Sequence, residues 1–390
     1  IVTLIVGTLN PNGYGAEMDE KISPLFSTTY LVLLYLSIGP LFAIPRTATV
    51  SFTTGITPFI TAGQTQLGLF IYTLIFFALV LLFSLRPSKI MTWIGKYINS
   101  IFLVLLFCLL VLAFIKPIGA FTSVQPVDSY VSQPFFTGLL EGYNTMDALA
   151  SLAFAIVLIN AIKEFHIKDA KEIAKITLRS GVLAVALMAV IYFGLTILGA
   201  QSVLLQGANE NGGVALAILA KHYYGAVGNV LLAGIMIFAC LKTAIGLVTS
   251  CAETFVEVFP KTVSYRIYAI GFTLVSFLLS NFGLDRILKY SLPALLFLYP
   301  ITIVFVLLLL VGSFVGENKI IYQSTIIATV IAAFMDTFSK PSYTFLHSAF
   351  TDGLVNLYQK LPMYEIGFAW VILSVIGLII GFLLSKILKK

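Results

Sequence analysis

The sequence predicts an all-α membrane protein that crosses the bilayer many times. Hydrophobic residues make up 59% of the 390 residues, charged residues account for only 10%, and the mean hydropathy is +1.02. A soluble domain carries about 25% charged residues, so this chain has too few charges to cover a surface in water. Its apolar runs are long and continuous, which excludes an outer-membrane β-barrel with short alternating strands.

The membrane-spanning segments can be placed from the apolar runs, because a spanning helix needs about 20 mostly apolar residues. The expected spans are about 28–47, 68–85, 97–115, 138–162, 181–200, 227–250, 266–281, 289–312, 319–337 and 364–387. The chain begins IVTLIV, which predicts a partial span at 1–7 and a truncated N-terminus. We expect the charged connector 163–180 to be a cytoplasmic surface helix. Segment 201–226 is apolar too briefly to span, and we expect a re-entrant or lid-like hairpin on the outer face.

The orientation follows from the lysines and arginines, most of which fall on one side of these spans. That side includes the connector 163–180 and the C-terminal KILKK (386–390). Cytoplasmic loops carry the excess of basic residues, so the C-terminus is predicted to be cytoplasmic and the loops 116–137 and 338–363 external. We interpret the net charge of +6 as topology and contact with anionic membrane lipid, with no nucleic-acid partner.

No catalytic or metal-binding pattern is visible. The three cysteines and three histidines are scattered, without the spacing of a metal site. No Ser/His or His/Asp/Glu cluster indicates an enzyme, and no pore-lining repeat indicates a channel. We therefore expect a protein that is not an enzyme and has no organic cofactor, and we keep a membrane-embedded enzyme or a channel as a remote alternative.

Polar residues interrupt the apolar segments at several places, where each charge costs about 2.5–3.5 kcal/mol on insertion scales. The stretch GPLFAIPRTATVSF (39–52) places Pro45 and Arg46 near the outer end of span 28–47. Pro45 lacks an N–H and should interrupt the helical ladder, and irregular backbone at this depth needs cover from protein or water. We expect Pro45 and Arg46 to end this span in an aqueous outer vestibule. A snorkelling arginine at a helix end is the alternative.

A second group of polar residues lies in the outer half of span 138–162, beside two glycines. Small and polar residues in a membrane helix mark a break or the lining of a cavity. The residues expected to line a substrate cavity are Asn144, Thr145, Asp147 and Ser151. The alternative is a structural role for Asp147 as a pairing carboxylate.

The stretch IFACLKTAIGLVTS carries a lysine, Lys242, close to mid-bilayer. Such a lysine must be paired, deprotonated or hydrated, and we expect an ion pair with Asp147 across the cavity. Thr243 and the hydroxyls after it are the hard oxygen ligands that Na⁺ prefers, unless they bond their own i−4 carbonyls. Pro293 and Pro300 interrupt a later span, which indicates a kink or a hinge for gating.

Three of these stretches together resemble one family. They are GPLFAIPRTATVSF (39–52), GYNTMDALASLAFAIVLINA (142–161) and ACLKTAIGLVTSCAE (239–253), and they resemble the bacterial branched-chain amino acid:cation symporters of the BrnQ type. The resemblance runs along the whole chain. It implies a LeuT-type inverted-repeat transporter with five-plus-five core spans and two additional spans, lacking the first span and most of the second. The single transporter domain, 1–390, would then comprise an incomplete first repeat (1–115), a second repeat (138–312) and two further spans (319–387).

The function implied by the resemblance is import of leucine, isoleucine and valine by symport with Na⁺ across the bacterial inner membrane. Span 138–162 would correspond to the broken sixth helix and supply the substrate-binding residues. Span 227–250 would correspond to the eighth, where Thr243 would complete a partial Na⁺ site. Pro45, Arg46 and Lys242 would serve in gating or in the vestibule. Proton coupling through Lys242 is the alternative, and the sequence does not set the oligomeric state.

Overall fold

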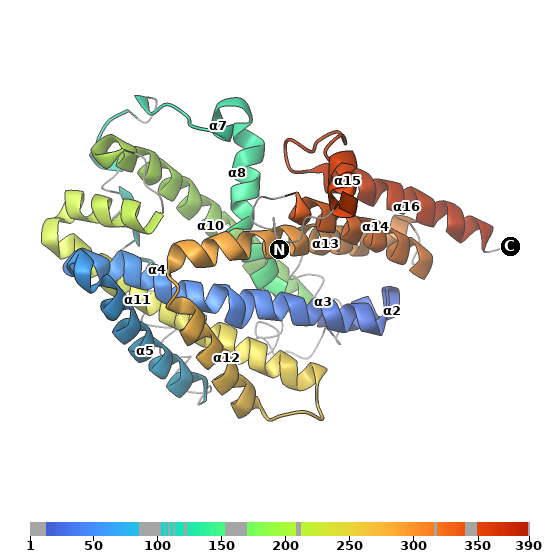
Figure 1. Ribbon diagram of the computed structural model, residues 1–390, viewed down its shortest axis with the longest axis horizontal. Coiled ribbons are helices and arrows are strands. Elements are labelled where there is room, and N and C mark those ends of the chain that lie inside the picture. The colour runs from blue at the N-terminus through green and yellow to red at the C-terminus, as the bar shows by residue number, and fades with distance from the viewer. Residues whose placement is uncertain are drawn as a thin grey trace. The chain divides into compact units, whose positions relative to one another are not determined.

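The computed structural model describes residues 13–85, 123–152, 170–207, 212–315, 318–339 and 349–388, with short pieces between 103 and 120. This described part of the chain is helical and contains no strand (Figure 1). Seven of its helices are long and apolar enough to cross a membrane. An eighth is possible if Tyr265–Ser280 and Leu284–Ser291, which meet at 112°, form one broken span. The prediction of an all-α polytopic membrane protein is confirmed.

Each of the seven candidate spans overlaps a predicted one, although their bounds differ and the described part of 138–162 does not form a continuous span. The partial span 1–7, most of 97–115 and the second half of 138–162 lie outside the described residues. The prediction for the connector 163–180 was wrong over its described part, because residues 170–180 do not form a separate surface helix. From Ala170 it is already the start of α10 (Ala170–Gln206), because its helical periodicity runs into the apolar span with no proline between them and Gly181, at the junction, stays helical.

The chain divides into two compact units, each built from separate stretches of sequence. Unit 1 contains Ile1–Ser37, Val127–Leu183 and Lys289–Lys390, and unit 2 contains Ile38–Pro126 and Ala184–Leu288. The described helices of unit 1 are α2 (Gly13–Lys21), α3 (Pro24–Leu36), α7 (Ser129–Ser132), α8 (Pro134–Tyr143), α14 (Lys319–Phe338), α15 (Ala349–Tyr358) and α16 (Ala369–Ile387). Those of unit 2 are α4 (Ala43–Gly55), the 3₁₀ turns η2 (Thr57–Phe59) and η3 (Ala62–Gln64), α5 (Thr65–Ser84), α11 (Gly212–Val258) and α12 (Tyr265–Ser280). The boundary runs through η1 (Ser37–Leu41), α10 and α13 (Leu284–Val315).

Unit 2 is organised around close packing of α4 against α11, with α5 and α12 beside them (Figure 1). Gly55 allows this approach, since a Cβ there would lie 3.1 Å from the Cα of Ala233. Hydrogen bonds between polar side chains and neighbouring helices also hold the helices of unit 2 together. The Tyr72 hydroxyl donates to Ser51 Oγ at 2.8 Å, and the Tyr265 hydroxyl donates to the Ser84 carbonyl at 2.8 Å.

Unit 1 contains a second close helix pair, α14 and α16 (Figure 1). Gly377 and Gly381 of α16 form a G-x-x-x-G spacing that faces the backbone of α14, a sequence feature that lets membrane helices approach closely. The hydroxyls of Thr329 and Ser374 hydrogen-bond across the same interface at 2.8 Å. In the same unit, the rings of Tyr14 and Phe305 meet edge to face at 5.2 Å.

The span predicted at 28–47 is broken, but earlier than expected. α3 ends at Leu36, Gly39 adopts non-helical dihedral angles (φ −100°, ψ −122°) and α4 begins at Ala43. The carbonyl of Pro40 accepts a hydrogen bond from Ser276 Oγ at 3.3 Å, which compensates a group that the break removes from the helical ladder.

The prediction that Pro45 and Arg46 end this span is therefore wrong. Pro45 lies in the first turn of α4, where the backbone N–H groups have no partner within the helix, so its missing N–H costs nothing. The Arg46 amide makes the first regular bond, to the Phe42 carbonyl at 3.0 Å, and α4 continues to Gly55. The hydroxyls that follow bond carbonyls of their own helix: Thr47 Oγ1 to Ile44 at 2.6 Å and Ser51 Oγ to Thr47 at 2.7 Å.

Candidate functional site

A break in the helix at residues 144–146 is the first part of the candidate site. α8 ends at Tyr143, and the chain is helical again from Asp147. The amides of Asn144 and Met146 bond carbonyls three residues back, at 3.0 and 3.1 Å, which closes the end of α8. Met146 has a positive φ of 61°, a conformation that costs a non-glycine residue roughly 1–2 kcal/mol. The Ala150 amide then bonds the Met146 carbonyl at 2.8 Å and starts the next half-helix.

The four predicted substrate-binding residues all lie at this break. Thr145 is exposed, and Asn144, Asp147 and Ser151 are half-buried. Four hydrogen bonds connect these residues to their own segment: Asn144 Nδ2 to Glu141 Oε2 at 2.8 Å, Thr145 Oγ1 to the Gly142 carbonyl at 2.8 Å, the Asp147 amide to Thr145 Oγ1 at 3.4 Å, and Ser151 Oγ to the Ala148 carbonyl at 2.7 Å. The expectation that these small and polar residues mark a break is confirmed, and contact with substrate stays a prediction.

An aromatic stack anchors the break within unit 1. The rings of Tyr143 and Tyr299 are parallel, at an interplanar angle of 4° and a centroid distance of 4.2 Å. Both side chains are buried. Tyr299 precedes Pro300 inside α13, so the last residue of α8 rests on the proline-containing part of α13. Sequence reasoning missed this pair, since nothing in the sequence places two tyrosines from distant spans together.

Asp336 is a second residue that sequence reasoning missed. It lies near the end of α14, and only 5% of its surface is exposed. Burial raises the pKa of Tyr358 in α15 above its ordinary value, and the nearby Asp336 carboxylate raises it further. A buried carboxylate in a membrane helix is by default a candidate functional residue. The sequence contained a signal for this residue, because Asp336 is an acidic side chain just inside the end of the apolar run 319–337.

Lys242 and Thr243 lie on α11, in unit 2. Lys242 is half-buried, whereas Thr243 is exposed and its hydroxyl donates to the Ala239 carbonyl at 2.9 Å. The sequence analysis gave this bond to the i−4 carbonyl as the alternative to Na⁺ coordination. The two are compatible, because a hydroxyl oxygen that donates one hydrogen bond keeps lone pairs that can coordinate a cation. Asp147 belongs to unit 1. The ion pair between Lys242 and Asp147 would join the two units and stays a prediction.

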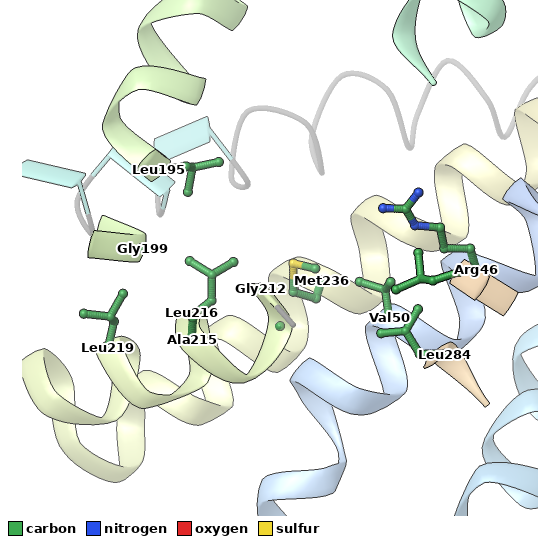
Figure 2. Close-up of a pocket in the computed structure, with 12 residues that line it drawn as sticks. Arg46, Val50, Leu195, Gly199, Gly212, Ala215, Leu216, Leu219, Met236 and Leu284 are labelled. Carbon is green, nitrogen blue, oxygen red and sulfur yellow. The ribbon is translucent and has the colours of Figure 1, made fainter. Parts of the chain in front are cut away.

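A pocket of about 340 Å³ within unit 2 is the second part of the candidate site (Figure 2). Arg46 and Val50 contribute from α4, while Leu195 and Gly199 contribute from α10. The remaining lining residues are Gly212, Gly213, Ala215, Leu216, Leu219 and Met236 of α11, and Leu284 and Leu288 of α13. Figure 2 shows Arg46 at one end of this group and Leu219 at the other. The predicted vestibule residue Arg46 therefore lines a pocket, although it does not end its helix.

The wall of this pocket includes the segment predicted to be a hairpin. α11 bends sharply at Gly225, whose positive φ of 60° and ψ of −143° suit only glycine. The helical part before the bend, 212–224, is too short to span. Leu219 packs with Leu110 and Leu198 in a buried apolar cluster. Segment 201–226 thus divides between the end of α10 and a short helix that turns back at Gly225.

Comparison with known proteins identifies the family. A model of the family described as branched-chain amino acid transport protein matches residues 1–388. This chain belongs to that family. The branched-chain amino acid permease BrnQ of Lactobacillus delbrueckii subsp. lactis is 44% identical over 357 residues, which cover 91% of this chain and 79% of the relative. BrnQ of Bacillus subtilis is 37% identical, covering 95% and 82%, and BraB of the same organism is 36% identical, covering 94% and 81%.

Proposed function

We propose that this protein imports branched-chain amino acids by symport with Na⁺ across the bacterial inner membrane, with its C-terminus in the cytoplasm. Membership of the family and relatives named as branched-chain amino acid permeases support the substrate class. The observation that carries the proposal to particular residues is the helix break at 144–146, because interrupted helices form the substrate sites of many secondary transporters.

The two half-helices at the break offer complementary charges to an amino acid zwitterion. A helix carries roughly half a positive charge at its N-terminus and half a negative charge at its C-terminus. The first-turn amides after Met146 suit the substrate carboxylate, and the last carbonyls of α8 suit its ammonium group. The Asp147 carboxylate offers the ammonium a charged partner. Met146 and Leu149 are buried and supply an apolar side for the branched chain.

The set of helices that pack together in unit 2 supports an inverted repeat. In the LeuT-type assignment, α4 and α5 are the third and fourth spans of the first repeat, and α11 and α12 are the third and fourth of the second. The two corresponding pairs pack together in one unit, with α4 against α11 and α5 against α12. Pairing of equivalent helices is what a pseudo-two-fold axis between repeats requires.

Discrimination among leucine, isoleucine and valine should be weak. One methylene in an apolar pocket is worth about 1–3 kcal/mol, and leucine and isoleucine differ only in where one methyl group is attached. Isoleucine should therefore inhibit uptake of labelled leucine at concentrations similar to those of leucine, and valine, which is one methylene smaller, at concentrations about tenfold higher or more. An amino acid with a charged side chain should not compete.

The coupling ion is tested by replacing Lys242. We expect leucine uptake into proteoliposomes to follow an imposed Na⁺ gradient, with Thr243 contributing one oxygen ligand. The second candidate is proton coupling, favoured by a half-buried lysine at mid-depth in α11. Uptake is measured with a Na⁺ gradient alone and with a pH gradient alone, for the unaltered protein, for Lys242→Met, and for Lys261→Met as a control at an exposed position.

Three outcomes separate the candidates. Uptake that follows Na⁺ in all three proteins supports symport with Na⁺. Uptake that ignores Na⁺ but follows pH, with this dependence lost only in Lys242→Met, supports proton coupling through Lys242 and rejects the sodium assignment. Absence of uptake by the unaltered protein under both gradients rejects the proposed function itself.

A further inference from the structure

The segment between α15 and α16, residues 358–368, is a turn-rich structure that we call the brace. Its backbone is closed by hydrogen bonds from the Gly367 amide to the Tyr364 carbonyl at 2.9 Å and from the Phe368 amide to the Met363 carbonyl at 3.0 Å. Met363 and Gly367 have positive φ angles of 67° and 74°. A non-glycine residue keeps this conformation only where its surroundings enforce it, so the brace is held in one shape.

One end of the brace is anchored on α14 through Asp336 and Tyr358. Both side chains are buried, with 5% and 1% of their surfaces exposed, and the Asp336 carboxylate lies close enough for its charge to act on the Tyr358 hydroxyl. The Tyr358 ring meets the Tyr364 ring edge to face at 5.8 Å, and α15 packs on α14. Because a buried carboxylate is costly unless its neighbours stabilise it, Asp336 and Tyr358 hold each other in place.

The other end of the brace packs against α8. The ring centroids of Phe368 and Phe136 are 5.8 Å apart. A Cβ on Gly367 would lie 2.8 Å from Leu140 Cδ1, so the glycine lets Leu140 rest directly on the backbone of the brace. Phe136, Leu140 and Tyr143 follow the i, i+4, i+7 spacing of one helix face, and Tyr143 is the residue that stacks on α13. One face of α8 is therefore held along its length, within unit 1.

This support ends at the candidate substrate site. Tyr143 is the last residue of α8, and the charge of Asp336 also acts on its side chain. The last carbonyls of α8 are the groups suited to the ammonium of the substrate. Their position depends on how firmly α8 is held.

We propose that Asp336 is a positioning residue for transport: through Tyr358 it fixes the brace, and the brace holds the last carbonyls of α8 in place for the substrate. This role rests on the proposed function and deepens it. α8 stays attached to the brace throughout the transport cycle, and movement at the break belongs to the half-helix that begins at Asp147.

The first test loosens the anchor. Asp336→Asn removes the charge and keeps the size of the side chain, and Glu365→Gln, at an exposed acid of the brace, is the matched control. KM and kcat for leucine uptake are measured in proteoliposomes. We expect Asp336→Asn to raise KM about tenfold, equivalent to one weakened hydrogen bond to the charged ammonium, with a smaller fall in kcat. Glu365→Gln should match the unaltered protein. Loss of folded protein alone would lower the rate of uptake and leave KM unchanged.

The second test ties α8 to the brace with a disulfide. Leu140 Cγ, which a cysteine sulfur would replace, lies 3.6 Å from a Cβ on Gly367, so the pair Leu140→Cys/Gly367→Cys can be bridged after a small shift. Oxidation of this pair in the Asp336→Asn protein should return KM to within about twofold of the unaltered value, and reduction should reverse the rescue.

The control pair is Thr329→Cys/Ser374→Cys, whose hydroxyl oxygens lie 2.8 Å apart between α14 and α16. Its disulfide should leave the KM of Asp336→Asn raised, because it does not touch α8. Disulfide formation is followed by mass spectrometry of the linked peptides, and the unaltered protein reports the contribution of the native cysteines.

Three results would overturn the inference. The first is a KM of Asp336→Asn within about twofold of the unaltered value. The second is a disulfide between positions 140 and 367 that stops uptake until it is reduced, because α8 would then have to leave the brace during the cycle. The third is failure of that disulfide to form. Absence of leucine uptake by the unaltered protein would instead reject the proposed function, and disulfide formation, which needs no transport, would still test the contact of α8 with the brace.

Discussion

The G-x-x-x-G contact between α14 and α16 permits a quantitative prediction. A Cβ on Gly377 would lie 2.6 Å from Ala328 Cβ, 2.8 Å from the Ser324 carbonyl oxygen and 3.0 Å from Thr325 Cα. A Cβ on Gly381 would lie 2.9 Å from Ile321 Cα. Two of these neighbours are Cα atoms and one is a carbonyl oxygen, so a rotamer change cannot relieve the overlap and the helices must separate.

The expected free-energy change follows from two opposing terms. Inserting one methyl group into a closely packed contact costs about 1–3 kcal/mol, while replacing glycine by alanine within a helix gains about 0.8–1 kcal/mol. Gly377→Ala and Gly381→Ala should therefore each destabilise the protein by up to about 2 kcal/mol. Gly271→Ala in α12 should have the opposite sign, because its Cβ would meet nothing within 4 Å and only the propensity gain remains.

The assay is the rate of thermal inactivation in detergent, followed as loss of the monodisperse peak on size-exclusion chromatography at one fixed temperature. A rate is the appropriate quantity because many large proteins unfold irreversibly, and their stability is then measured as a rate of inactivation. Both variants at the helix interface should inactivate faster than the unaltered protein, and Gly271→Ala should inactivate no faster. Equal or slower inactivation of Gly377→Ala and Gly381→Ala would refute the close packing of α14 against α16.

Two further predictions concern the helix breaks. Tyr143→Ala should remove the stack on Tyr299 and lower the maximal rate of leucine uptake, while Tyr143→Phe, which keeps the ring, should retain most of it; equal rates for the two variants would contradict an anchoring role. At the first break, a Cβ on Gly39 would lie 2.6 Å from Cys251 Sγ, so Gly39→Ala should destabilise by about 1–3 kcal/mol. The added Cys251→Ala substitution should restore part of this loss in the same inactivation assay, since the two sites are in contact, and strict additivity of the two effects would argue against that contact.

The break at Asn144–Met146 could be predicted because its cause is local. Two glycines, Asn144 and Thr145 weaken the helix within a few residues, and this composition is visible in any apolar segment. The break between α3 and α4 was predicted at Pro45, six residues after its observed position at Gly39, because the prediction gave the proline more weight than the glycine. A proline in a first helical turn is compatible with the helix, so the glycine was the stronger signal. The division of α11 at Gly225 is a similar case, in which the polar and glycine-rich segment predicted a turn but not its position.

The remaining features depend on contacts between distant parts of the chain. The stack of Tyr143 on Tyr299, the proximity of Asp336 to Tyr358, and the pocket around Arg46 each join residues from separate helices. Periodicity and composition give the faces of single helices, but they do not specify which faces meet. The apolar character of nearly every helix in a membrane protein removes even the usual distinction between a buried and an exposed face.

The central claim is that the break at 144–146 holds the substrate, and the most direct test is protection of Thr145 from a thiol reagent. Thr145 is exposed, so Thr145→Cys should react with a water-soluble maleimide, and the rate of the unaltered protein gives the contribution of the native cysteines. Ser180→Cys, at an exposed position of α10, is the control. We expect leucine to slow labelling of Thr145→Cys several-fold at concentrations that saturate uptake, and to leave Ser180→Cys unchanged. Labelling of Thr145→Cys at the same rate with and without leucine, in a variant that still transports leucine, would contradict the claim.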